Sequence, residues 1–297
     1  MNYLKSAFGI GFLGAGLMGC GSAAVSSVSA GPSKPQSTKP SKVLAVPSGV
    51  VGASSPLPNG TLWVLAGNVA SKGIFQVELS GGKIVASISV SNNASAIAQS
   101  QTGEIGIGIA TPQGGGALEF HSGVTGSLVS TVPLSGPVVA LCAGSDGKTF
   151  FALTKVGSGT SVSIVDDSTG KVISTVPSPA SSISIAVTPS ERHVYVVQDT
   201  GIVMEVSTSN GQIDGQFSVG HSAHFVAISN DGSSLYVLKG QDLVRNVAVV
   251  DVAREAVTKV LPAASSSVGL ALSPDDSTLY DIVGNAAYGN IQVFGLA

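Results

Sequence analysis

The sequence contains little charge, few aromatic side chains and hardly any cysteine. Of its 297 residues, 10% are charged, 5% are aromatic and two are cysteines. The formal net charge of −3 provides no basic surface of the kind that neutralises a phosphate backbone, so we expect no nucleic-acid partner. Long amphipathic helices are not evident either, which argues against a helical domain.

Glycine and β-branched residues are what the sequence has in abundance. It contains 38 glycines and 43% hydrophobic residues, with many valines and isoleucines. Valine and isoleucine favour strands, and glycine favours the tight turns between them. A chain of this length can bury a sizeable core. The composition therefore predicts a large all-β domain.

The first twenty residues have the pattern of a bacterial lipoprotein signal. Lys5 precedes an apolar run over residues 7–18, and Leu17-Met18-Gly19-Cys20 is similar to a lipobox that ends in the lipidated cysteine. About a dozen apolar residues are few for a bilayer core of about 30 Å, so a cleaved signal fits better than a retained helix. We expect lipidation at Cys20, which leaves Cys142 as a buried structural thiol without a disulfide partner.

Such a signal divides the chain into three regions. Residues 1–19 are the signal peptide, residues 20–41 the lipidated cysteine with a Ser/Pro/Lys-rich tether, and residues 42–297 the folded domain. The expected location is extracytoplasmic, as a membrane-anchored lipoprotein at the cell surface or in the periplasm. The membrane is then a partner through the lipid anchor, and we expect the domain to be a monomer.

Two turn markers repeat through the folded domain with a period of about 40 to 45 residues. Each second marker precedes the next first marker by 21 residues, as from Gly82 to Gly103. This constancy predicts the four-stranded blades of a β-propeller. The first marker, in segments such as ISNDGSSLYVL, falls at Gly60, Gly103, Gly147, Glu191, Gly232 and Asp276. The second, in segments such as VDDSTGKVISTV, falls at Gly82, Gly126, Gly170, Gly211 and Glu255.

The ends of the chain predict how the ring of blades closes. The sixth repeat stops after its third strand, at residues 290–294, whereas residues 42–47 are similar to the outer strand at residues 171–177. An N-terminal strand that completes the last blade would remove an open sheet edge. We predict six four-stranded blades, with seven as the alternative.

Three segments, SVSIVDDSTGKVISTV, AISNDGSSLYVL and ALSPDDSTLYDIVGN, resemble the YVTN-type β-propeller repeat of bacterial and archaeal surface proteins. The tetrad that names the repeat is degenerate here, at residues 195–198, 236–239 and 280–283. The resemblance covers residues 42–297 and implies the propeller fold. Related propellers include lactone hydrolases, domains of metal enzymes and non-catalytic binding proteins, so the resemblance implies no single activity.

The mouth of the central channel is the first place to look for a site. We label the strands of a blade A to D from the axis outward. One equivalent position on the six A strands holds a single histidine and no carboxylate, so we predict no catalytic residue, no metal ion and no cofactor there. His224 is the histidine, at a place where YVTN-type repeats often carry one, and His221 could share a ligand with it if residues 220–223 form a loop. The alternative is a hydrogen-bonded lining histidine. The six positions are Gly52, Ser95, Val139, Ile183, His224 and Val268.

The loops between strands B and C are the second place to look for a site. They account for the variable spacing from each first marker to the following second marker, and variable loops on a constant scaffold are where function is usually carried. Hydrogen-bonding and charged side chains concentrate in the last three of these loops, although solvated loop residues are the alternative interpretation. The candidate ligand-binding residues are Asp199, Gln241, Asp242, Arg245, Asn285 and Tyr288.

These features favour a non-catalytic binding module that presents its B–C loops to a protein, a glycan or a small molecule. The alternative is a lactonase-like hydrolase at the channel mouth, with His224 as the acid/base. The sequence has neither a GxSxG nucleophile elbow nor a phosphate-binding loop, which makes an enzyme the less favoured interpretation.

Overall fold

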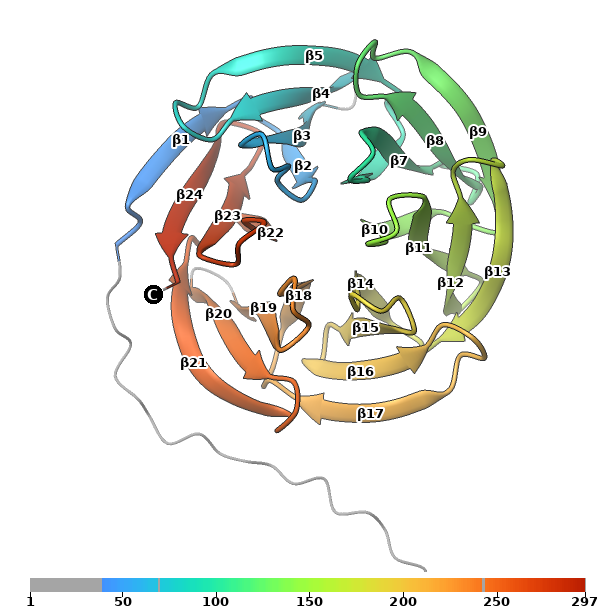
Figure 1. The fold of residues 1–297 in the computed structure, drawn as a ribbon, viewed down its shortest axis with the longest axis vertical. Helices are drawn as coiled ribbons and strands as arrows, with labels where there is room; N and C mark the ends of the chain where they lie inside the picture. The colour runs from blue at the N-terminus through green and yellow to red at the C-terminus, as the bar shows by residue number, and fades with distance from the viewer. Residues whose placement is uncertain (1–38, 69, 242–243, 297) are drawn as a thin grey trace, which may run out of the picture.

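A computed structural model describes residues 39–68, 70–241 and 244–296. Within these residues, 24 strands form six four-stranded antiparallel sheets, which are the blades of a six-bladed β-propeller (Figure 1). In the same ranges no helix is long and apolar enough to cross a membrane. The predicted fold class is confirmed, with six blades. Cys20 and Asp242, two of the predicted site residues, lie outside the described residues.

Blades 1 to 5 are each one meander, in which four consecutive strands run from the axis outward. Blade 1 contains β2 (Val50–Ala53), β3 (Thr61–Asn68), β4 (Ser71–Glu78) and β5 (Ile84–Val90). Blade 2 contains β6 (Ala94–Gln99), β7 (Glu104–Ala110), β8 (Gly116–Ser122) and β9 (Leu128–Leu134). Blade 3 contains β10 (Val138–Ala143), β11 (Thr149–Val156), β12 (Gly159–Asp166) and β13 (Lys171–Ser178). Blade 4 contains β14 (Ser182–Val187), β15 (His193–Gln198), β16 (Ile202–Ser207) and β17 (Ile213–Ser218). Blade 5 contains β18 (Ala223–Ile228), β19 (Ser234–Gln241), β20 (Val244–Asp251) and β21 (Ala256–Ala263).

Blade 6 joins the two ends of the chain. Its three inner strands are β22 (Ser267–Leu272), β23 (Thr278–Gly284) and β24 (Gly289–Gly295), and its outer strand is β1 (Lys42–Val46). β1 pairs antiparallel with β24, from Lys42 opposite Val293 to Val46 opposite Gly289. The predicted closure by the N-terminal strand is therefore confirmed, and blades 6 and 1 lie side by side in the ring (Figure 1).

The repeated turn markers have a conformational cause. All eleven positions have a positive φ, between +50° and +99°. Glycine adopts this left-handed region without the steric cost that a side chain imposes, which explains why it recurs there. Glu191, Glu255 and Asp276 are the exceptions, because they adopt the same conformation with a side chain. The markers identify the A–B and C–D turns of the blades.

The two ends of the propeller have different connections. The A–B and C–D turns lie at one end, which we call the turn face, and the B–C loops and D–A connections lie at the other, which we call the loop face. Because β24 ends at the turn face and β1 is antiparallel to it, Lys42 starts β1 at the turn face. Residues before β1 therefore join the domain on the side opposite the B–C loops.

An apolar cluster lies between each pair of neighbouring blades. Trp63 and Ile105, for example, are buried together between blades 1 and 2. Between blades 2 and 3, the rings of Phe120 and Phe150 meet edge to face, with centroids 5.1 Å apart. Each sheet is covered on both faces, so the B strands are apolar along most of their length, as the burial of β3 and β7 shows.

Candidate functional site

The A strand of every blade has a one-residue bulge near its start, close to the loop face. In five blades the bulged residue is the one that the sequence places in the channel ring, but in blade 1 it is Val51 instead of Gly52. The cause is the A–B connection of blade 1, residues 54–60, whose Pro56 and Pro58 lie in a longer turn than that of blade 2. All six bulged residues are partly exposed, and they are Val51, Ser95, Val139, Ile183, His224 and Val268.

His224 is bound to the backbone of its own blade. Its Nε2 donates a hydrogen bond to the Gly240 carbonyl oxygen at 2.7 Å. Gly240 has a φ of +128°, and a Cβ there would lie 2.1 Å from the Val244 carbonyl oxygen, so only glycine fits. In the parts of the chain that the structure describes, no group of three His, Cys, Asp or Glu side chains could hold a metal ion. His224 thus has the geometry of a hydrogen-bonded lining residue.

His221 lies in the D–A connection before His224. Residues 219–222 are outside the strands, and β18 begins at Ala223, so the loop that a shared ligand would require is present. His221 is exposed, whereas the His224 ring is directed at Gly240. The two histidines therefore lie on the same face without a common hydrogen-bond partner among the described residues.

Arg245 and Tyr288 converge on one connection between blades 5 and 6. The Arg245 guanidinium donates to the Ser267 carbonyl oxygen, and the Tyr288 hydroxyl donates to the Ser266 Oγ at 3.0 Å. Arg245 also lies opposite Gly240 in the pairing of β19 with β20. The hydrogen bonds thus connect His224, through the Gly240 backbone, to the Arg245 and Tyr288 side of the loop face. We call His224, Arg245, Ser266 and Tyr288 the loop-face cluster.

Asn285 holds the loop that carries Tyr288 of this cluster. Its Oδ1 accepts hydrogen bonds from the Ala287 and Tyr288 amides, at 2.8 Å and 3.2 Å, which holds the B–C loop of blade 6 in an Asx turn. The Asn285 side-chain oxygen therefore helps to position Tyr288. Asp199 and Gln241 are exposed in the B–C regions of blades 4 and 5.

A buried carboxyl group near the cluster was not among the residues predicted from the sequence. Asp281 in β23 is 0% exposed, its Oδ2 accepts from the Ala264 amide at 3.0 Å, and its Oδ1 has no hydrogen-bond partner among the described residues. Burial raises the pKa of Asp281, while the Ala264 amide, Ser267 and the charge of Arg245 oppose the increase. A signal was present, since the corresponding B-strand residues in the other blades are apolar: Val64, Ile107, Ala152, Val196 and Val237.

Among the described residues, the loop face carries more positive than negative side chains. Lys72, Lys155, Lys239 and Arg245 lie near the B–C loops, and Asp199 is the carboxylate among the described residues there. Lys72 donates to the Ala94 carbonyl oxygen and Lys239 to the Val219 carbonyl oxygen. Burial lowers the pKa of both ammonium groups. Lys72 and Lys239 therefore bind the ends of neighbouring blades, and all four cations contribute a positive potential to the loop face.

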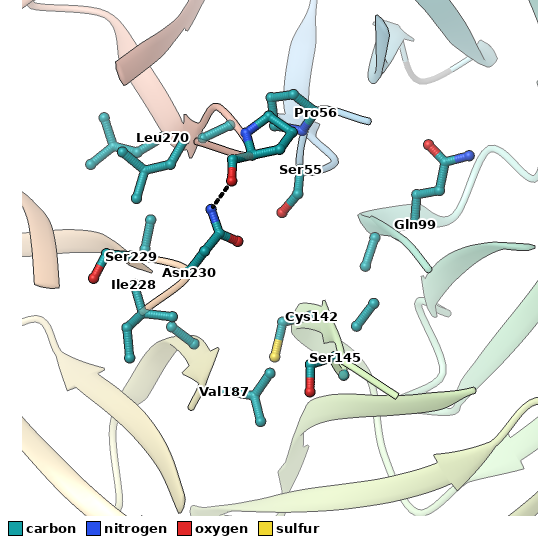
Figure 2. Close-up of a pocket in the computed structure, with 18 of the residues that line it drawn as sticks. Ser55, Pro56, Gln99, Cys142, Ser145, Val187, Ile228, Ser229, Asn230 and Leu270 are labelled. Atoms are coloured by element: carbon teal, nitrogen blue, oxygen red, sulfur yellow. Dashed lines mark hydrogen bonds between the residues drawn. The ribbon is translucent and has the colours of Figure 1, made fainter. Parts of the chain in front are cut away.

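A cavity opens at the other end of the molecule. It has a volume of about 510 Å³ and occupies the channel beside the A–B turns, between the C-terminal ends of the A strands (Figure 2). Cys142, Val187 and Ile228 contribute to its wall, and Ser145 and Asn230 lie where the A strands meet the turns. Cys142, predicted to be a buried structural thiol, is a partly exposed residue of this wall (Figure 2) and packs against the apolar cluster between blades 3 and 4. Sequence patterns did not indicate the cavity, because small and apolar residues line most of it.

Comparison with known proteins shows similarity in structure only. No protein-family model matches the chain, and no curated protein matches it in sequence. A chain of hydrazine synthase from Kuenenia stuttgartiensis is similar in fold, with a TM-score of 0.61 and 13% sequence identity. The match covers 84% of this chain and 76% of that chain. At this identity the likeness supports the β-propeller fold and says nothing about activity.

Proposed function

We propose that the chain is an extracytoplasmic lipoprotein of the YVTN-type repeat family, which uses the loop face as a non-catalytic binding surface. The observation that carries the proposal is the position of the loop-face cluster relative to the N-terminus. Arg245 and Tyr288 meet at Ser266 and Ser267 on the loop face, whereas β1 begins at Lys42 on the turn face. A tether joined to the turn face leaves the loop face accessible to a partner.

The geometry of the cluster favours binding over hydrolysis. In the described residues the partner of the His224 ring is a backbone carbonyl oxygen, which orients the imidazole but does not add the negative charge by which a carboxylate raises its basicity. Tyr288 is 42% exposed, and its hydroxyl binds Ser266, the residue before the Ser267 that binds the Arg245 guanidinium. Exposed tyrosine and arginine side chains are frequent in the central parts of binding surfaces. The excess of cations favours a partner with acidic groups.

The lipid anchor can be tested by metabolic labelling with an alkyne fatty acid. We expect label on the full chain, and its loss in the Cys20→Ser variant. Label that persists in this variant, or a wild-type chain that takes up none, contradicts the anchor. Protease treatment of intact cells or spheroplasts then tests the location, because an extracytoplasmic domain is cleaved before the membrane is opened.

The binding surface can be tested with a photo-crosslinking amino acid placed at single positions in the cell. Benzoylphenylalanine at Tyr288 should form a discrete adduct, whose mass distinguishes a protein from a glycan partner. Val124 is the matched control, because it is 94% exposed and lies in a C–D turn on the turn face. Arg245→Ala should weaken the Tyr288 adduct. Equal crosslinking at both positions, or none at Tyr288, contradicts the assignment of the loop face.

A further inference from the structure

Apolar residues are the most numerous around the turn-face cavity, but polar and apolar atoms contribute similar shares of its surface. Val187, Ile228 and Leu270 lie around it in Figure 2, and Cys142 is the single titratable side chain that lines it within the described residues. A volume of about 510 Å³ is in the range of small-molecule sites, which are typically apolar cavities with a few oriented polar groups. The cavity is distinct from the loop-face cluster, which lies at the opposite end of the channel.

Two carboxylates contact residues of the cavity mouth directly. The Glu191 Oε1 accepts hydrogen bonds from the Ser145 Oγ at 3.0 Å and from the Asp146 amide at 2.7 Å. The Asp276 carboxylate accepts from the Asn230 amide and from the Asn230 Nδ2, both at 2.8 Å in their shorter contacts. Ser145 and Asn230 line the cavity. Carboxylates from blades 4 and 6 are therefore held next to its mouth by side chains of blades 3 and 5.

The backbone at these two positions is unfavourable for the residues present. Glu191 has a φ of +57° and Asp276 a φ of +56°, whereas the other four A–B markers are glycine. A side chain in this region has a steric cost, and such residues concentrate at functional sites. Because glycine occupies the other four A–B markers, the turn conformation does not require a carboxylate at these two positions.

Other charges around the mouth add to the negative potential. Asp146, Asp231 and Asp275 lie in the A–B turns of blades 3, 5 and 6, against Lys148 and Arg192 in the turns of blades 3 and 4. Hydrogen bonds from the Ser273 and Ser277 hydroxyls lower the pKa of Asp275 to about 2. Asp231 is lowered in the same way by Ser229 and Ser233, so its pKa also lies below the usual value. These carboxylates remain ionised over the physiological pH range.

The negative potential of these carboxylates extends from the mouth to the cavity wall. Burial raises the pKa of the Cys142 thiol to about 12, the Val187 backbone opposes the increase, and the negative charge of Glu191 adds to it. The Glu191 carboxylate lies beside Gly144 and Ser145, which line the cavity, so a ligand at this part of the wall would experience its charge.

We propose that the turn-face cavity binds an organic cation of the alkylammonium class, with its aliphatic body against the apolar side chains of the wall and its charged head at the mouth, on the side of Glu191. The apolar side chains stabilise the body by burying apolar surface, and the negative charge at the mouth stabilises the head. Glu191 is the principal specificity residue, because its carboxylate lies beside Gly144 and Ser145 of the cavity lining, whereas Asp276 adds negative potential from the junction of blades 5 and 6.

The natural thiol in the wall provides the test. In the full chain at pH 9, where more of the thiol is ionised than at neutral pH, Cys142 is modified with a methanethiosulfonate reagent that carries either a trimethylammonium or a sulfonate group, and peptide mass spectrometry quantifies the product at Cys142. We expect the cationic reagent to react several-fold faster than the anionic one. Hexyltrimethylammonium should protect Cys142 from the neutral reagent N-ethylmaleimide, while hexyl sulfate and hexanol at equal concentration should protect it less.

Conservative variants separate the charge from the fold. Glu191→Gln keeps an acceptor for the Asp146 amide and removes the charge, and it should lower the cation-to-anion rate ratio about threefold, as should Asp276→Asn. Asp251→Asn is the matched control, since this carboxylate lies at the end of β20, beside the C–D turn at the outer edge of the same face, and should leave the ratio unchanged. Thermal unfolding verifies that each variant is folded at the assay temperature.

Three results would overturn the proposal. The first is a wild-type rate ratio near one. The second is equal protection by hexyltrimethylammonium, hexyl sulfate and hexanol, which indicates an apolar cavity without charge selectivity. The third is an equal effect of Asp251→Asn and Glu191→Gln, which indicates a response to net charge alone. None of these results bears on the loop-face cluster.

Discussion

Carboxylate side chains occupy three of the eleven left-handed turn positions, and they differ in what they contact. Glu191 and Asp276 hydrogen bond to the preceding blade, so each fastens two blades at the turn face. Glu255 is exposed in the C–D turn of blade 5. The same backbone strain is therefore compensated at two positions by contacts between blades.

Replacing each glutamate with glycine should have opposite effects. Glu255→Gly relieves a φ of +50° and should raise the free energy of unfolding by roughly 0.5 to 1 kcal/mol. Glu191→Gly relieves a similar strain but removes the hydrogen bonds to Ser145 and Asp146, so it should lower that free energy by about 1 kcal/mol. Denaturant unfolding of both variants is the measurement. Changes of the same sign would show that Glu191 does not fasten blades 3 and 4.

The buried carboxyl of Asp281 should make stability depend on pH. Its pKa is raised in the folded chain, so its contribution is fully present below the unfolded pKa of about 3.9 and is lost as pH rises through the folded value. Asp281→Asn removes the titration and keeps an acceptor for the Ala264 amide. The variant should gain stability over the wild type between pH 4 and pH 7, measured by unfolding at several pH values. A difference that is constant with pH contradicts a raised pKa.

At the scale of strands, β1 is the element on which the ring depends. Leu44 is 2% exposed and belongs to the cluster between blades 6 and 1, whereas the neighbouring Val43 is 56% exposed. Leu44→Ala should lower the free energy of unfolding by about 2 to 4 kcal/mol, while Val43→Ala should change it by less than about 0.5 kcal/mol. Thermal or denaturant unfolding of the pair tests this. Similar small effects would mean that β1 is not needed for closure.

The strands could be predicted from the sequence because the repeat fixes both turn sets. A positive φ favours glycine, so the glycines at positions such as Gly103 and Gly170 indicate left-handed turn residues in the sequence. Closure was visible because residues 42–47 have the pattern of an outer strand. In blade 1 the bulged residue is Val51, one position before the predicted Gly52. The A–B connection with Pro56 and Pro58 is longer there, so counting back from the turn marker gives a position one residue too late in the A strand.

The site could be predicted only in part. The face was indicated by variable loops, but the contacts of Arg245 and Tyr288 with Ser266 and Ser267 depend on how two blades pack, which no local pattern records. Asn285 was selected for its polarity, and its side-chain oxygen proved to be hydrogen bonded within its own turn. The turn-face cavity has no sequence signal, because it is a space between strands whose residues are otherwise ordinary core residues.

Considered as a whole, the molecule is a ring with two unlike ends. In the part of the chain that the structure describes, the loop face has an excess of cations and the loop-face cluster, while the turn face has the cavity, the carboxylates of the A–B turns and the start of β1. The proposed display of the loop face away from the anchor depends on β1 pairing with β24, because that pairing decides at which end the chain enters the domain.

A double-cysteine crosslink tests that pairing most directly. Val43 lies opposite Gln292, so Val43→Cys with Gln292→Cys, in a chain that also carries Cys142→Ser, should form a disulfide under mild oxidation. The crosslinked chain should migrate faster on a non-reducing gel and unfold at a higher temperature. Val43→Cys with Lys259→Cys is the control, since Lys259 lies on the outer strand of blade 5. Efficient crosslinking of the control pair, or none between positions 43 and 292, would contradict the closed six-bladed ring.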